Sequence, residues 1–82
     1  MKLEETKELM CSLDYKERFK AEYYQLKIRY DKLKYMCEKW DNGQLNFTPT
    51  CPRELYDSQL LAMEVYLDVL KERAEMENIE VE

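Results

Sequence analysis

Basic and aromatic side chains alternate along one line of the first long helical segment. The line consists of Lys20, Tyr24, Lys27, Asp31 and Lys34, and steps of three and four residues place all five on one helix face. A lysine can hold a phosphate while a tyrosine ring stacks on a base, so the lysines and Tyr24 are candidates for binding a nucleotide-type ligand. Asp31 offers the structural alternative, because it lies one turn from both Lys27 and Lys34 and can neutralise them. Self-neutralised helix faces of this kind are the more common case.

A second candidate for anion binding is Arg53, in the expected first turn of a later helix. Exposed backbone amides and the helix dipole favour an anion there, and the hydroxyls of Thr48 and Thr50 can add hydrogen bonds. The alternative is that Arg53 pairs with Asp57 one turn further on. Four aromatic residues are further candidates for contact with a ligand or an interface: Tyr15, Tyr24, Tyr35 and Trp40.

No catalytic constellation is apparent in the sequence. The chain has no histidine, which removes the usual general base and the commonest metal ligand. No nucleophile and base stand at a spacing that would pair them. Its three cysteines, Cys11, Cys37 and Cys51, are too scattered for a disulfide framework or a zinc site and are expected to be buried thiols. Whether Cys37 and Cys51 touch stays open. We therefore predict a non-enzymatic protein without a metal site or cofactor.

Two long helices are needed to position these residues. Asp14 followed by Glu17 resembles a capping box, which starts the first helix. Apolar residues then recur in steps of four and three over three heptads: Phe19, Tyr23, Leu26, Tyr30, Leu33, Cys37 and Trp40. This seam predicts a helix over about residues 14–40. Residues 1–13 form a short helical segment that either precedes this helix or runs into it.

The break at residues 41–51 contains the only glycine of the chain. Gly43 is predicted to end the first helix, because glycine readily takes the left-handed conformation that closes one. Leu45 and Phe47 are expected to turn inward and plug the open end of the helix pair.

The second helix is predicted over about residues 52–78, with Pro52 as its first residue and Cys51 at the cap. One apolar line should face the first helix: Tyr56, Leu60, Met63, Leu67, Leu70 and Ala74. An adjacent line is left over and is predicted to form an oligomer interface: Leu55, Ala62, Tyr66, Val69 and Met76.

Length and charge limit the remaining possibilities. A chain of 82 residues has a thin core, so help from a partner chain is expected. Residues 14–40 carry a net charge of +3 and residues 53–82 a net charge of −6, which favours antiparallel pairing of the two helices. The overall net charge of −5 opposes binding to duplex DNA. No apolar run is long enough to span a membrane and the acidic start is unlike a secretion signal, so we expect a cytoplasmic protein. The resulting fold prediction is a single all-α domain over residues 1–82, an antiparallel two-helix hairpin assembled into a homo-oligomeric bundle.

Several segments together resemble small helical proteins of tailed phages without an assigned activity, including relatives of a crAss-like phage protein. The segments are residues 14–23, 40–43, 47–52 and 59–67. The likeness covers residues 14 to about 80, and Thr-Pro-Thr-Cys-Pro at 48–52 is its most specific part. More loosely, the hairpin plan is similar to phage counter-defence sponges, which assemble into oligomers and sequester cyclic nucleotide signals of bacterial immunity. That similarity concerns architecture and carries over no ligand residues.

Two functions are consistent with these features. The first is sequestration of a nucleotide-type immune signal at a subunit interface, in the host cytoplasm if the protein is viral. The second is a protein-binding module that blocks a host or defence protein through the acidic second helix or the leftover apolar line.

Overall fold

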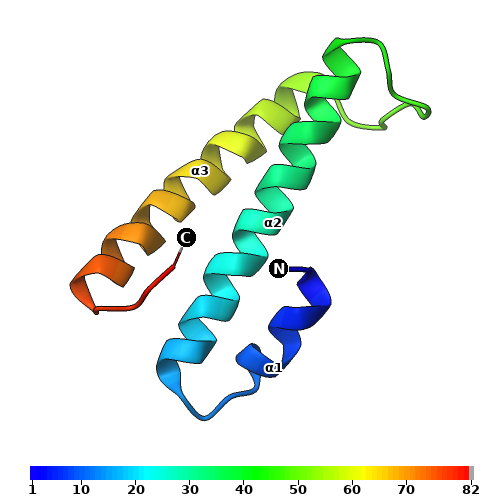
Figure 1. Ribbon diagram of the computed structural model, residues 1–82. Helices are drawn as coiled ribbons and strands as arrows, with labels where there is room; N and C mark the ends of the chain where they lie inside the picture. Colours follow the sequence, from blue (N-terminus) through cyan, green and yellow to red (C-terminus); the bar gives the residue numbers. More distant parts are fainter. Residues whose placement is uncertain (82) are drawn as a thin grey trace.

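Helices are the only regular elements in the computed structural model, which describes residues 1–81. Two long helices, α2 (Tyr15–Asp41) and α3 (Arg53–Met76), run in opposite directions and pack against each other (Figure 1). A 3-10 turn, η1 (Leu3–Glu5), and a short helix, α1 (Thr6–Met10), fold back along α2. The all-α prediction is confirmed, and the N-terminal segment precedes the first long helix instead of extending it.

The start of α2 is capped by Asp14, whose Oδ1 accepts a hydrogen bond from the backbone N–H of Lys16 at 3.0 Å. The reciprocal half of the predicted capping box is different. The backbone N–H of Asp14 donates to Oγ of Ser12 at 3.0 Å, so a residue before the helix replaces Glu17 in this role. The guanidinium of Arg18 also donates to the carbonyl of Ser12 at 2.8 Å, which ties the preceding turn to the helix.

Both long helices end in the same hydrogen-bonded closure. At the end of α2, Gly43 has φ +70° and donates to the carbonyl of Trp40, while Gln44 donates to the carbonyl of Lys39 at 2.8 Å. These two bonds form a Schellman motif, so the prediction that Gly43 ends the helix is confirmed. At the end of α3, Asn78 takes the left-handed position with φ +57°.

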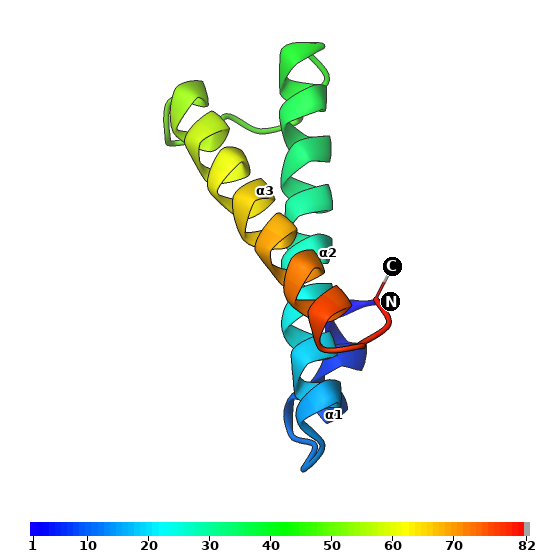
Figure 2. The same ribbon diagram turned by 90° about the vertical axis from the view of Figure 1, so that its left-hand side faces the viewer.

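The closure at Asn78 turns the chain back onto the helix pair. The backbone N–H of Ile79 donates to the carbonyl of Ala74 at 2.8 Å, and the Ile79 side chain is buried. It joins a core cluster whose members come from the start of α2, the end of α3 and the tail: Phe19, Tyr23, Leu67, Leu70, Ala74 and Ile79. This end of the pair is therefore closely packed, whereas the two helices diverge toward the loop (Figure 2).

The start of α3 differs by one residue from the prediction. Pro52 has φ −62° and ψ 150°, an extended conformation, and its carbonyl accepts from the N–H of Leu55 at 3.1 Å. Pro52 is therefore the cap and Arg53 is the first helical residue. In the preceding loop Leu45 is half-buried, but Phe47 is 54% exposed, so the expected inward plug is wrong for Phe47.

The short α1 segment is anchored to α2 by side-chain hydrogen bonds. Thr6 is buried, its hydroxyl donates to the carbonyl of Leu3 at 2.6 Å, and it accepts from Nε2 of Gln25 at 3.0 Å. This contact places η1 beside the middle of α2. Within residues 1–81, neither long helix carries the continuous apolar stretch that crossing a bilayer would take.

Candidate ligand-binding site

The predicted basic line lies on α2, where part of its charge is already balanced. Nζ of Lys27 is 3.6 Å from a carboxylate oxygen of Asp31, which is the structural alternative set out for this face. Nζ of Lys34 lies 5.9 Å from the centre of the Tyr30 ring. Lys20 makes no ion pair or side-chain hydrogen bond with the residues that the structure describes. The line therefore retains Lys20 and Lys34 as cations without a carboxylate partner.

Tyr24, the aromatic member of this line, packs against the core. Its ring meets the Tyr23 ring edge-on, with the ring centres 5.4 Å apart, and the side chain is half-buried. Part of the ring surface thus remains available beside the lysines.

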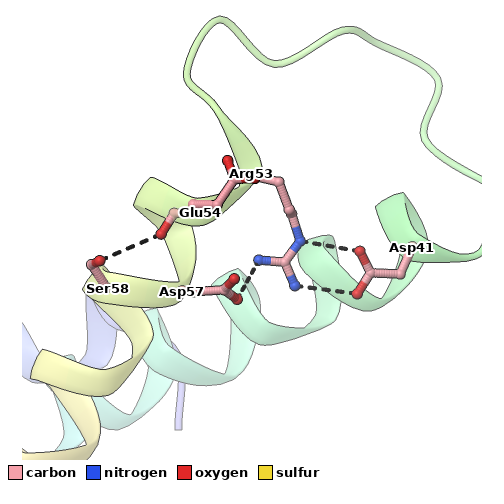
Figure 3. Close-up of polar contacts among 5 residues, drawn as sticks. All are labelled: Asp41, Arg53, Glu54, Asp57 and Ser58. Carbon is pink, nitrogen blue, oxygen red and sulfur yellow. Dashed lines mark hydrogen bonds and ion pairs between the residues drawn. The ribbon is translucent and has the colours of Figure 1, made fainter.

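Arg53 occupies the predicted position at the start of α3 and is held by two carboxylates (Figure 3). Its Nε and Nη2 lie 3.1 and 3.2 Å from the two oxygens of Asp41, a bidentate pair that joins the end of α2 to the start of α3. Its Nη1 lies 2.7 Å from Asp57 one turn on. The hydrogen bonds to Asp41 raise the pKa of Arg53, and the same contact lowers the pKa of Asp41. The positive charge at this helix start is therefore balanced within the protein itself.

Trp40 lies beside this ion-pair cluster. Its ring meets the Tyr56 ring edge-on at 5.8 Å, and the Arg53 guanidinium lies 5.9 Å from its centre. A hollow of about 240 Å³ adjoins it, lined by Trp40, Gly43, Leu45, Phe47, Thr48 and Pro49. Thr50 is exposed and does not line this hollow.

All three cysteines are free thiols, but Cys11 is exposed, so the expectation that all three are buried is wrong for it. Cys37 is buried between the helices, and its burial raises the pKa of the thiol. Cys51 is half-buried and forms no disulfide with it. Within residues 1–81, no cluster of histidine, cysteine and carboxylate side chains is arranged to hold a metal ion.

A hollow of about 410 Å³ lies where η1, α2 and α3 meet, and sequence reasoning singled out none of its residues as ligand contacts. We call it the methionine groove. Four of its lining residues are apolar and three are polar: Leu3, Leu33, Met36 and Met63, with Arg29, Lys32 and Gln59. A sequence signal for part of it exists. Residues 29, 32, 33 and 36 follow the i, i+3, i+4, i+7 spacing of one helix face, which combines two cations with two apolar side chains.

The cations of the methionine groove differ from Arg53 in having no partners. Arg29 and Lys32 are exposed, and neither makes an ion pair or a side-chain hydrogen bond within the described residues 1–81. No acidic residue lines the groove. The site therefore combines apolar surface with uncompensated positive charge.

A third hollow, of about 350 Å³, lies at the packed end and is lined by Tyr15, Arg18, Phe19, Glu22 and Arg73. Its charges are already engaged. Arg73 donates to the hydroxyl of Tyr15 at 2.9 Å, lies 3.4 Å from Glu77 and covers the Phe19 ring at 5.0 Å. The carboxylate of Glu22 accepts from the hydroxyl of Tyr66 across the two helices. The charged and hydroxyl groups around this hollow therefore serve to link α2 to α3.

The leftover apolar line of α3 is exposed along its whole length. Its members are Leu55, Ala62, Tyr66, Val69 and Met76, and Met76 reaches 85% exposure. Leu61 and Val65 widen the same surface. Helix α3 thus has two apolar faces, and α2 covers only one of them. The other face is free to contact a partner.

Comparison with known proteins assigns the chain to a family. Residues 13–76 match the model of the Sequestin family. The chain belongs to this family. The matched range contains all of α2, the loop and α3, including Arg29, Lys32 and Met63 of the groove. No curated protein and no solved structure matches the chain. The name of the family indicates a sequestering, binding role.

Proposed function

We propose that this Sequestin protein binds an anionic, nucleotide-type signal and sequesters it chemically unchanged, as a homo-oligomer of helical chains. The observation that carries the proposal is the presence of unpaired cations beside apolar surface on α2, in a chain whose net charge is −5. A cation that balances an internal carboxylate stabilises the fold, whereas one without a partner is available to an external anion. Phosphate supplies that anion, and a base supplies an apolar face.

The expected assembly joins copies through the exposed line of α3. This line is a continuous apolar strip, whereas a monomeric protein usually exposes its apolar residues singly. Sequestration benefits from such an assembly, because a second copy can cover a ligand that a two-helix chain leaves open to water. The predicted contacts Lys20, Tyr24, Lys34, Trp40 and Thr50 remain candidates for a larger ligand that reaches beyond one chain.

Isothermal titration calorimetry against a panel of cyclic nucleotides and ADP-ribose derivatives tests the binding. We expect heat of binding with at least one member and recovery of that compound unaltered by chromatography after release. Heat with none of them would refute the proposal, and a chemically altered ligand would show an enzyme in place of a sequestering protein.

A second candidate function is supported by the acidic border of the exposed α3 line. Glu54, Asp68 and Glu72 are exposed on this helix beside the apolar residues, a surface suited to a basic protein partner. Exchanging both Lys20 and Lys27 for alanine separates the candidates. That change should weaken binding of a ligand spread along the α2 lysine line, yet leave binding to a partner of α3 nearly unaltered.

A further inference from the structure

We infer that the methionine groove holds the ring system of the sequestered nucleotide and that Arg29 and Lys32 bind its phosphate. The inference rests on the proposed function and assigns it to residues outside the predicted lysine line. The volume of the methionine groove, about 410 Å³, lies in the range of small-molecule sites, which is about 300 to 1,000 Å³.

Charge separates this groove from the hollows at Trp40 and at Tyr15. The hollow at Trp40 has no cation in its lining, and the hollow at Tyr15 pairs Arg73 with Glu77 and includes the carboxylate of Glu22. Only the groove among these three combines two cations with no acidic lining residue. An added anion therefore meets no carboxylate competing for the same cations.

Helix geometry sets the two cations side by side. Arg29 and Lys32 are three residues apart, so their side chains leave α2 on neighbouring turns of one face. A guanidinium can grip two phosphate oxygens at once, and the ammonium supplies a further point charge. Together they suit a monoester phosphate, which offers three free oxygens, better than a carboxylate, which offers only two.

The apolar part of the groove suits a flat ring. Met36 and Met63 come from the two helices and Leu33 lies between the cations and Met36 along α2. Methionine side chains are flexible and polarizable, so they can adapt to an aromatic surface. The Gln59 amide both donates and accepts hydrogen bonds, which matches the mixed edge of a nucleobase.

The groove also adjoins the exposed line of α3. Gln59 is four residues after Leu55 and three before Ala62, so the three share one strip of the helix surface. A second copy seated on that line therefore lies next to the groove opening. Binding of the nucleotide and association of the chains are expected to strengthen each other.

Two matched double variants test the assignment with the calorimetric panel described above. Arg29→Ala with Lys32→Ala removes two positive charges from the groove, and Lys16→Ala with Lys71→Ala removes two exposed charges from the packed end, outside the groove and the lysine line. We expect the groove pair to weaken binding by about tenfold or more, and the control pair by less than about threefold. Far-UV circular dichroism verifies that both variants keep the helical content of the wild type.

Methyl NMR of the five methionines adds a readout that does not depend on charge. On adding the bound nucleotide, the methyl signals of Met36 and Met63 should shift, while that of Met10 on α1 should not. Equal weakening by the two variant pairs, or unmoved Met36 and Met63 signals during binding, would overturn the groove but not sequestration. If no panel compound binds the wild type, the proposed function fails and the groove assignment fails with it.

Discussion

The two ends of the α2–α3 pair are held together by different interactions. At the packed end, Phe19, Tyr23 and Leu70 are 3% exposed or less and meet the buried Ile79 of the tail. At the loop end, the helices diverge (Figure 2). They are linked there by the exposed ion pair of Arg53 with Asp41 and by the edge-on contact of the Trp40 and Tyr56 rings. The methionine groove lies on the loop side of the core cluster, since its lining continues to Met36 on α2 and begins at Gln59 on α3.

This difference assigns separate tasks to the two ends. Burial of apolar side chains supplies most of the stability of a small domain, whereas exposed ion pairs contribute little. The packed end therefore maintains the fold. We expect the loop end to open at lower free energy than the packed end, and ligand-binding regions commonly lie in such parts.

The largest predicted effect is the loss of a core side chain at the packed end. Leu70 is fully buried, so Leu70→Ala should lower the free energy of unfolding by about 2–5 kcal/mol. Leu61 on the same helix is 63% exposed, and Leu61→Ala should change it by about 0.5 kcal/mol or less. Urea unfolding followed by circular dichroism measures both. Equal losses would contradict the division between the packed core and the exposed face.

The exposed line of α3 should control association and not the fold of one chain. Val69→Asp places a charge in the middle of this line, and burying an unpaired charge in an interface is costly. We expect the dissociation constant of the assembly to rise about tenfold or more, with the helical content unchanged. Size-exclusion chromatography with light scattering measures the shift toward the monomer.

Leu13 provides the matched control for this variant. It is 99% exposed and lies in the turn before α2, so Leu13→Asp adds the same charge away from α3. This control should associate like the wild type. A wild type that is monomeric at micromolar concentration would contradict the predicted interface outright.

Local signals in the sequence were sufficient for the elements of the fold. The cap at Asp14, the stop at Gly43 and the heptad seam each depend on residues close together in the chain, so they could be predicted. The shift from Pro52 to Arg53 at the start of α3 lies within the usual uncertainty of a helix end. The prediction for Phe47 was wrong because Leu45 and Phe47 lie in an irregular segment, where a spacing of two residues does not define which side chains face the core.

The site was harder to predict because its residues meet through tertiary packing. Arg53 finds Asp41 twelve residues earlier in the chain, a separation at which helix periodicity gives no signal. The groove likewise joins Leu3 of η1 to Met63 of α3. The spacing of Arg29 and Lys32 was visible in the sequence, but their lack of acidic partners became apparent only in three dimensions.

A smaller effect is predicted at the helix closure of the loop end. Gly43 has φ +70°, a conformation that costs a residue with a Cβ roughly 1 kcal/mol, while no atom lies within 4 Å of an added Cβ. Gly43→Ala should therefore lower the free energy of unfolding by about 1 kcal/mol through the backbone alone. Asn42→Ala is the neighbouring control, because Asn42 has an ordinary φ of −89°. Urea unfolding distinguishes the two, and a loss at Asn42 as large as that at Gly43 would contradict a conformational origin.

The smallest effect concerns the ion pair that joins α2 to α3, and it depends on pH. Arg53 holds the pKa of Asp41 below its ordinary value near 3.8, so near that pH the folded chain binds fewer protons than the unfolded chain. The stabilising contribution is thus present above about pH 4 and is lost as the pH falls through the lower folded pKa. A double-mutant cycle of Asp41→Asn and Arg53→Ala should give favourable coupling at about pH 7 that declines below about pH 4. Coupling that stays constant down to about pH 2 would show that the Asp41 charge does not hold this end together. Packing of Trp40 against Tyr56 would then be the main link between the helices at the loop.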